Sequence, residues 1–269
     1  MERIKQALER ARQEQVRNMG AGVVHPLAPV DSPESQITYS ETRVTTVSPS
    51  VLKRHRIITG TETDEVTAAY KILRTQVLQR MVSKGWNALA VTSPGPGQGK
   101  TVTAINLAIS LAREVHHTVL LVDLDMRRPS IHRYLGLKAE VGISDVLTKG
   151  TPVSHALVNP GIDRLVVLPG REALPNSSEL LKSPRMVQLV KELKSRYLTR
   201  LIIFDLPPLL SVDDAIAFAP YVDAALVVVA EGLTTREELQ HASGLLANTP
   251  VVGTVLNRSS EKATPYFNA

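Results

Sequence analysis

The sequence predicts an α/β domain in which a mostly parallel sheet is flanked by helices on both faces. Apolar runs rich in β-branched residues recur at 88–91, 118–122, 164–168, 201–204, 224–229 and 251–256. Segments with helical spacing separate several of these runs, most clearly at 101–114 and 235–246. Strands that alternate with helices form parallel sheets, because each helix carries the chain back to the edge where the next strand starts.

Composition limits the class of protein. Of the 269 residues, 43% are hydrophobic and 21% are charged, which suits one substantial domain with an appendage. The absence of cysteine excludes disulfides and thiolate metal sites. No apolar run approaches the roughly 20 residues that span a bilayer. The net charge of +5 is spread out with little aromatic interleaving, which favours a solvated basic surface over a nucleic-acid site.

The first 60 residues are predicted to lie outside the domain. Residues 1–19 have helical spacing with a narrow apolar face, and we expect this amphipathic helix to dock on a partner or on the domain. Residues 20–60 carry proline, serine and threonine without periodicity, which predicts a disordered linker ahead of a domain at 61–269. The basic run 53–56 is interpreted as a solvated cluster, with a dedicated site as the alternative.

A helix is predicted at 61–82, directly before the strand at 88–91. We expect it to pack on the sheet edge or to contact another subunit. Its buried face is predicted to contain Val66, Ala69, Ile72, Leu73, Val77 and Leu78.

A glycine-rich loop follows the strand at 88–91. Residues 93–101 read Ser-Pro-Gly-Pro-Gly-Gln-Gly-Lys-Thr and open the next helix, a context in which backbone N–H groups converge on a phosphate. Lys100 would reach the β- and γ-phosphates, and the Thr101 hydroxyl would bind Mg²⁺. Pro94 replaces the first glycine of the usual pattern, so the loop is a variant. The residues predicted to bind the nucleotide are Gly95, Gly97, Gln98, Gly99, Lys100, Thr101, Val102 and Asn257.

Carboxylates end two of the predicted strands. Asp123 and Asp125 follow the run at 118–122, and Asp205 follows the run at 201–204. The carboxyl ends of parallel strands open onto the ligand crevice, so these side chains are expected near the phosphate loop. Asp205 is placed like the acidic residue that holds Mg²⁺ in phosphate-loop NTPases. Asn257 follows the last strand and is expected to reach the nucleotide base.

Three motifs together resemble the bacterial tyrosine kinases (BY-kinases) of capsule and exopolysaccharide synthesis, within the deviant-Walker ATPases that include MinD and ParA. The segments 96–101, 121–129 and 202–208 resemble the Walker A, Walker A′ and Walker B motifs of this group. Further similarity lies at 69–75, 175–181, 213–215 and 253–258. The resemblance implies a phosphate-loop NTPase fold.

The resemblance also implies roles. Lys100 would be catalytic by neutralising the phosphates of ATP, and Thr101 and Asp205 would handle Mg²⁺. One of Asp123 and Asp125 would accept the proton of an attacking tyrosine, and the other would assist the metal. The implied partner is a membrane polysaccharide co-polymerase whose cytosolic segment completes the active site, with a second copy of the chain as a further candidate. The chain would then be cytoplasmic, peripheral to the plasma membrane through that partner.

Some positions depart from the family pattern. MinD and ParA proteins carry a lysine where this chain has Gly95, which favours the kinase branch. The tail offers only Tyr266 as an acceptor, and the ring-forming Glu-x-x-Arg-x-x-Arg motif aligns with Ala68, Lys71 and Arg74. The predicted function is an ATP-dependent tyrosine kinase. The alternatives are an ATP-binding scaffold of polysaccharide export and a MinD/ParA-like positioning ATPase.

Overall fold

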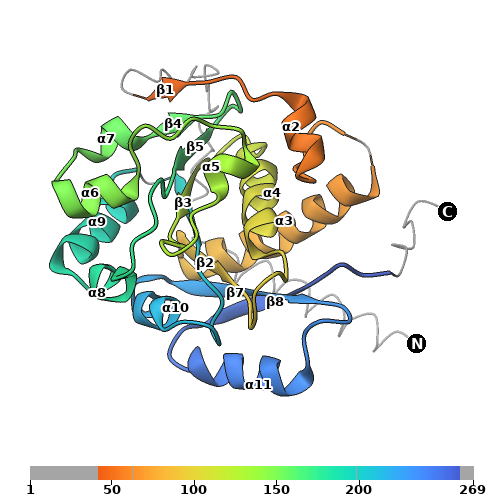
Figure 1. Ribbon diagram of the computed structural model, residues 1–269. Helices are drawn as coiled ribbons and strands as arrows, with labels where there is room; N and C mark the ends of the chain where they lie inside the picture. The colour runs from red at the N-terminus through yellow and green to blue at the C-terminus, as the bar shows by residue number, and fades with distance from the viewer. Residues whose placement is uncertain (1–41, 63, 198, 261–269) are drawn as a thin grey trace, which may run out of the picture. The chain divides into compact units, whose positions relative to one another are not determined.

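An eight-stranded sheet organises the chain in the computed structural model, which describes residues 42–62, 64–197 and 199–260 (Figure 1). The strand order is β1-β4-β5-β3-β6-β2-β7-β8, and every neighbouring pair is parallel except β4 with β5. The strands are β1 (Arg43–Val44), β2 (Ala88–Thr92), β3 (Thr118–Asp123), β4 (Val158–Asn159), β5 (Leu165–Leu168), β6 (Arg200–Asp205), β7 (Ala224–Ala230) and β8 (Val251–Asn257). The mostly parallel sheet predicted from the sequence is confirmed.

Helices cover both faces of this sheet. They are α2 (Pro49–Arg54), α3 (Glu65–Lys84), α4 (Lys100–Ala112), α5 (Ile131–Tyr134), α6 (Ile143–Lys149), α7 (Val153–Ala156), α8 (Ser177–Leu181), α9 (Pro184–Ser195), α10 (Asp214–Phe218) and α11 (Arg236–Leu245). A short 3-10 helix at Ala219–Tyr221 follows α10. None of these helices has the length and apolar content needed to cross a membrane.

The core consists of two apolar layers, one on each face of the sheet. Alternate residues of β2 belong to opposite layers. Leu89 and Val91 pack in the layer of α3 and α4, whereas Ala88 and Ala90 pack in the layer of α9, α10 and α11. Helix α4 is buried on nearly every side, because it lies between the sheet and α3. The central strands are therefore continuously apolar, as buried parallel strands are.

The linker predicted for 20–60 is wrong over its last part. Residues 43–60 contain β1 and α2, and Leu52, Ile57 and Ile58 are buried in the same apolar layer as α4. Asn106 of α4 fixes this segment, because its Nδ2 donates to the Arg56 carbonyl and its Oδ1 accepts from the Ile58 N–H, both at 3.0 Å. The segment belongs to the domain because it covers one face of α4. The helix predicted at 1–19 and the linker up to residue 41 lie outside the described residues.

The helix predicted at 61–82 is observed as α3, but its buried face differs from the predicted one. Of the six predicted residues only Val77 is buried, while Val66, Ala69 and Ile72 are exposed and Leu73 and Leu78 are partly buried. The buried positions are Thr67, Val77 and Met81. Helix α3 packs against α4, and its apolar side chains outside that contact are exposed or only partly buried.

Candidate active site

The glycine-rich loop connects β2 to α4, as predicted. Gly99 caps α4 with a φ of 91°, a left-handed conformation that glycine adopts without strain. A Cβ atom at this position would lie 2.0 Å from Nδ2 of Asn257, so only glycine fits. The segment that follows β6 holds the start of the loop, since the Leu209 and Leu210 N–H groups donate to the carbonyls of Ser93 and Pro94. Proline is tolerated at position 94 because this contact uses its carbonyl and needs no N–H group, which proline lacks.

The sheet register brings the predicted carboxylates together. Asp123 ends β3 and Asp205 ends β6, and the two residues are direct partners in the parallel β3–β6 pairing. Val91 of β2, the strand that leads into the loop, pairs with Asp205 on its other side. Asp125 lies two residues beyond the end of β3. Three separate segments of the sequence therefore meet at the carboxyl edge of three adjacent strands.

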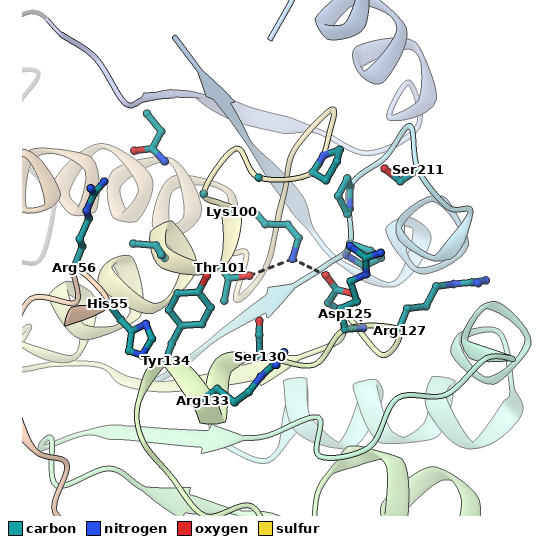
Figure 2. A pocket seen from close by; sticks show the side chains of 18 of the residues that line it. His55, Arg56, Lys100, Thr101, Asp125, Arg127, Ser130, Arg133, Tyr134 and Ser211 are labelled. Atoms are coloured by element: carbon teal, nitrogen blue, oxygen red, sulfur yellow. Dashed lines mark hydrogen bonds and ion pairs between the residues drawn. The ribbon is translucent and has the colours of Figure 1, made fainter. Parts of the chain in front are cut away.

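Lys100 lies between Thr101 and Asp125, and dashed lines join it to both (Figure 2). Its Nζ is 2.8 Å from Oδ2 of Asp125 and 3.4 Å from Oδ1 of Asp205. The Thr101 hydroxyl donates to Oδ2 of Asp205 at 2.7 Å. Lys100 is only 9% exposed, and Asp205 is fully buried. The ammonium group is therefore held at the mouth of the loop by two carboxylates.

Burial and mutual repulsion change the acidity of the carboxyl groups. Burial, together with the nearby charge of Asp205, raises the pKa of Asp123 to about 7, although N–H groups of Ser130 and Ile131 donate to its Oδ2. Burial also raises the pKa of Asp205, against the opposing effect of Lys100 and Thr101. For Lys100, burial opposes the charged form, but the carboxylates of Asp205 and Asp125 outweigh it and raise the pKa of the ammonium. Three carboxyl groups thus share the charge of a single lysine.

The donor set fits a hard divalent cation such as Mg²⁺. The Thr101 hydroxyl and the Asp205 carboxylate lie side by side, and Oδ1 of Asp123 is buried without a hydrogen-bond partner among the described residues. No group of three or more acidic or histidine side chains in the described part of the chain is arranged as a complete metal site. Mg²⁺ commonly uses one or two carboxylates and takes its other ligands from water and phosphate oxygens. The residues therefore fit a cation that arrives with its nucleotide.

A cavity of about 1020 Å³ opens above Lys100. Of the residues predicted to bind the nucleotide, Gly97, Gly99, Lys100, Thr101, Val102 and Asn257 line it. Gly95 is not in its wall, and the Gln98 side chain is 2% exposed beneath the loop. Asp125 lines the cavity, whereas Asp123 and Asp205 lie below its surface. The loop and one carboxylate therefore face the ligand space directly.

Asn257, which was predicted to reach the nucleotide base, is held by the loop. Its Nδ2 donates to the Gln98 carbonyl at 2.9 Å, and its Oδ1 accepts from the Arg258 N–H at 2.9 Å. The Arg258 guanidinium also donates to the Gly97 carbonyl. The end of β8 thus supports the glycine-rich loop from outside, and a base contact by Asn257 stays a prediction.

Several residues of the cavity wall were not predicted from the sequence. They are His55, Arg56, Pro96, Arg127, Arg128, Ser130, Arg133, Tyr134, Pro207, Pro208, Ser211, Val212 and Arg258. Arg127 and Arg128 lie within the motif at 121–129, and the two prolines lie within the motif at 202–208, so the motifs themselves carried a signal. His55 and Arg56 belong to the basic run that was interpreted as a solvated cluster, and their place in the wall follows only from the packing of α2 on α4 and α5.

Two of the other segments that resemble the family, 175–181 and 213–215, are connected to the site by side-chain contacts. Nε of Arg127 contacts Oδ1 of the fully buried Asp214 at 3.2 Å, which joins the Walker A′ segment to α10. The Ser178 hydroxyl donates to Asp213 at 2.5 Å, which joins α8 to the same helix. Arg74, which aligns with the ring-forming motif, instead pairs within the chain with Glu114 at 2.9 Å.

Comparisons with known proteins agree with this geometry. The model of a family described as an AAA domain matches residues 87–241. The tyrosine-protein kinase YwqD of Bacillus subtilis is 33% identical over 190 residues, which cover 70% of this chain and 79% of that protein. The chain belongs to the bacterial tyrosine-kinase family.

Two further comparisons show which part of the larger family members the chain matches. The tyrosine-protein kinase wzc of Salmonella typhimurium is 31% identical over 221 residues, but these are 80% of this chain and only 30% of wzc. The solved kinase domain of the Escherichia coli tyrosine kinase ETK superposes with a TM-score of 0.68 at 28% identity, and covers 82% of this chain and 92% of that domain. The similarity thus falls on the kinase domain of the family.

Proposed function

We propose that the chain is an ATP-dependent protein-tyrosine kinase that acts in capsule or exopolysaccharide synthesis and export. The observation that carries the proposal is the position of Lys100, which bridges Asp125 and Asp205 at the mouth of a glycine-rich loop. Phosphoryl transfer depends mainly on positioning and on neutralisation of charge, and these residues supply both. Family membership supports the same chemistry, because the related proteins are named as tyrosine-protein kinases.

Nucleotide entry would exchange the partners of Lys100. The phosphates of ATP would take its ammonium group, and Asp125 would lose the 2.8 Å ion pair that it makes without them. Asp125 faces the cavity, so its released carboxylate is the group we assign to accept the proton of an attacking tyrosine hydroxyl. The tyrosine oxygen then forms the new bond to the γ-phosphorus as the bond to ADP breaks.

Asp123, Asp205 and Thr101 are assigned to the metal in this proposal. These three residues would hold Mg²⁺, and the bound cation would supply neutralisation of the charge that develops on the phosphates. Asp205 and Thr101 are already paired with each other. Oδ1 of Asp123, which has no hydrogen-bond partner in the part of the chain that the structure describes, offers a further acceptor below them. In this assignment Asp125 accepts the proton and Asp123 contributes to the metal site.

The remaining parts of the proposal concern the setting of the kinase. The partner that we propose is a membrane polysaccharide co-polymerase whose cytosolic segment completes the site and holds the chain at the inner face of the membrane. A second copy of the chain is the proposed source of an acceptor tyrosine, with Tyr266 as the candidate on this chain. Both partners would approach the open side of the cavity.

The test is transfer of label from ATP. The purified chain is incubated with Mg²⁺ and γ-labelled ATP, with and without the cytosolic segment of the partner, beside Lys100→Ala and Tyr266→Phe. We expect phosphotyrosine that disappears in Lys100→Ala, and label that persists in Tyr266→Phe would place the acceptor elsewhere. Tight ATP binding without any phosphotyrosine under either condition would contradict the kinase assignment and leave an ATP-binding scaffold.

A further inference from the structure

The basic run 53–56 divides between solvent and the cavity. Lys53 and Arg54 are exposed on α2 and take no part in the cavity wall, whereas His55 and Arg56 line it. The His55 ring packs against Tyr134 of α5, with centroids 5.1 Å apart, so the turn that follows α2 is fixed against a neighbouring element. His55 and Arg56 therefore face the space where a nucleotide would bind.

Arg56 is held in an unusual backbone conformation. Its φ is 59°, in the left-handed region that non-glycine residues rarely adopt. Asn106, itself only 1% exposed, bonds to the Arg56 carbonyl and to the Ile58 N–H and so fixes the turn from both ends. Of the four non-glycine residues with positive φ in the described ranges, Arg56 and Arg258 line this cavity. Strain of this kind persists where the surrounding structure imposes it, often at ligand sites.

Arg56 lies at the end of the cavity away from the transfer chemistry. Figure 2 shows Asp125 and Arg127 on one side of Lys100, and Arg56 with His55 on the other. A nucleotide whose β- and γ-phosphates meet Lys100, with the γ-phosphate toward Asp125, must extend its nucleoside toward the opposite end. Arg56 lines the cavity at that end (Figure 2).

The arginine side chain is available for such a contact. Within the described residues, the Arg56 guanidinium has no hydrogen-bond or ion-pair partner, and the residue is exposed. By contrast, Arg258 donates to the Gly97 carbonyl, and each polar group of Asn257 already has a protein partner. Planar guanidinium groups stack on aromatic rings and are only weakly hydrated, which suits a purine base. We propose that Arg56 binds the nucleoside half of ATP by stacking its guanidinium on the base.

This proposal rests on the ATP binding of the proposed function but not on phosphoryl transfer. ATP affinity of the full chain is measured calorimetrically in Mg²⁺ for the unchanged protein, Arg56→Gly and Arg54→Ala. Glycine keeps the left-handed backbone at position 56 while removing the side chain, and thermal unfolding checks that the variant is folded. The Arg54 variant removes an equal charge from the same basic run outside the cavity.

We expect ATP and ADP affinity to fall about tenfold in Arg56→Gly and to stay within about twofold in Arg54→Ala. Inorganic tripolyphosphate, which lacks the nucleoside, should bind the unchanged protein and Arg56→Gly equally. Equal loss of tripolyphosphate affinity would place Arg56 on the phosphates and overturn the base contact, as would an unchanged ATP affinity or an equal loss in Arg54→Ala. A chain that binds ATP in this pattern but forms no phosphotyrosine would contradict only the kinase assignment.

Discussion

At the scale of single residues, the site depends on the pairing of Thr101 with Asp205. The hydroxyl donates to a carboxylate that is fully buried and whose pKa is raised chiefly by burial. Removing that donor leaves a buried charged group short of a partner, which costs about 1–3 kcal/mol in typical proteins. The same hydroxyl is the proposed metal ligand, so its loss should affect Mg²⁺-dependent binding in particular.

Thr101→Val should therefore lower ATP affinity about tenfold in Mg²⁺, while Thr101→Ser, which keeps the hydroxyl, should stay within about threefold of the unchanged protein. Titrations with ATP in Mg²⁺ and in EDTA check this, because the difference between Thr101→Val and the unchanged chain should vanish in EDTA. An equal loss in both conditions would assign Thr101 a purely structural role.

At the scale of secondary-structure elements, Asp145 closes the start of α6 and joins this helix to Arg171. It accepts from the Gly142 N–H at 3.0 Å and from Lys149 at 2.8 Å, and it pairs with Arg171. Burial opposes its ionisation, but the hydrogen bonds from Lys149 and Arg171 outweigh burial and lower its pKa to about 2. The ionised form is therefore favoured in the folded state relative to the unfolded chain.

The stability contributed by Asp145 should be complete above its unfolded pKa of about 4 and should be lost as the pH falls toward 2. We expect Asp145→Asn to reduce the free energy of unfolding by about 2 kcal/mol at pH 7. Urea unfolding of the variant and the unchanged chain at pH 7 and at pH 3 should show that difference shrinking at the lower pH. A difference that stays constant or grows on acidification would contradict the assigned charge interaction.

At the scale of the whole molecule, the segment 43–60 is a structural part of the kinase domain. Leu52 is 6% exposed and shares the apolar layer of α4, whereas its neighbour Lys53 is exposed. Truncation of a buried leucine costs about 2–5 kcal/mol, because both transfer free energy and packing are lost.

Leu52→Ala should accordingly lower the free energy of unfolding by at least about 2 kcal/mol, and Lys53→Ala by less than about 0.5 kcal/mol. Chemical denaturation with a shared m-value for the three proteins measures both. A Leu52 variant as stable as the unchanged chain would mean that this segment behaves as the linker that the sequence suggested.

The carboxylate cluster, Arg56 and helix α3 show how much of the site and the fold could be predicted from the sequence. The apolar runs that end in Asp123 and Asp205 are local sequence patterns, and a parallel sheet places the ends of its strands together. The carboxylate cluster could therefore be predicted from the sequence. The position of Arg56 was not, because it depends on a turn fixed by Asn106, which is 50 residues away in the chain. The prediction of the buried face of α3 was wrong for a related reason. Periodicity identifies the apolar residues of a helix, but it does not show which of them the neighbouring helix α4 covers.

The central claim is the proposal that one cavity binds the phosphates of ATP through Lys100 and uses Asp125 to accept the proton of the attacking tyrosine hydroxyl. The most direct measurement is ATP affinity and phosphotyrosine formation in the same preparations of the unchanged chain and of Asp125→Asn, with Asp163→Asn as the control, because Asp163 is exposed and outside the cavity. We expect Asp125→Asn to bind ATP within a few-fold of the unchanged chain while phosphotyrosine formation falls by about 10²–10⁴, and Asp163→Asn to match the unchanged chain in both. Phosphotyrosine formation that survives Asp125→Asn would contradict the assignment of this carboxylate as the proton acceptor.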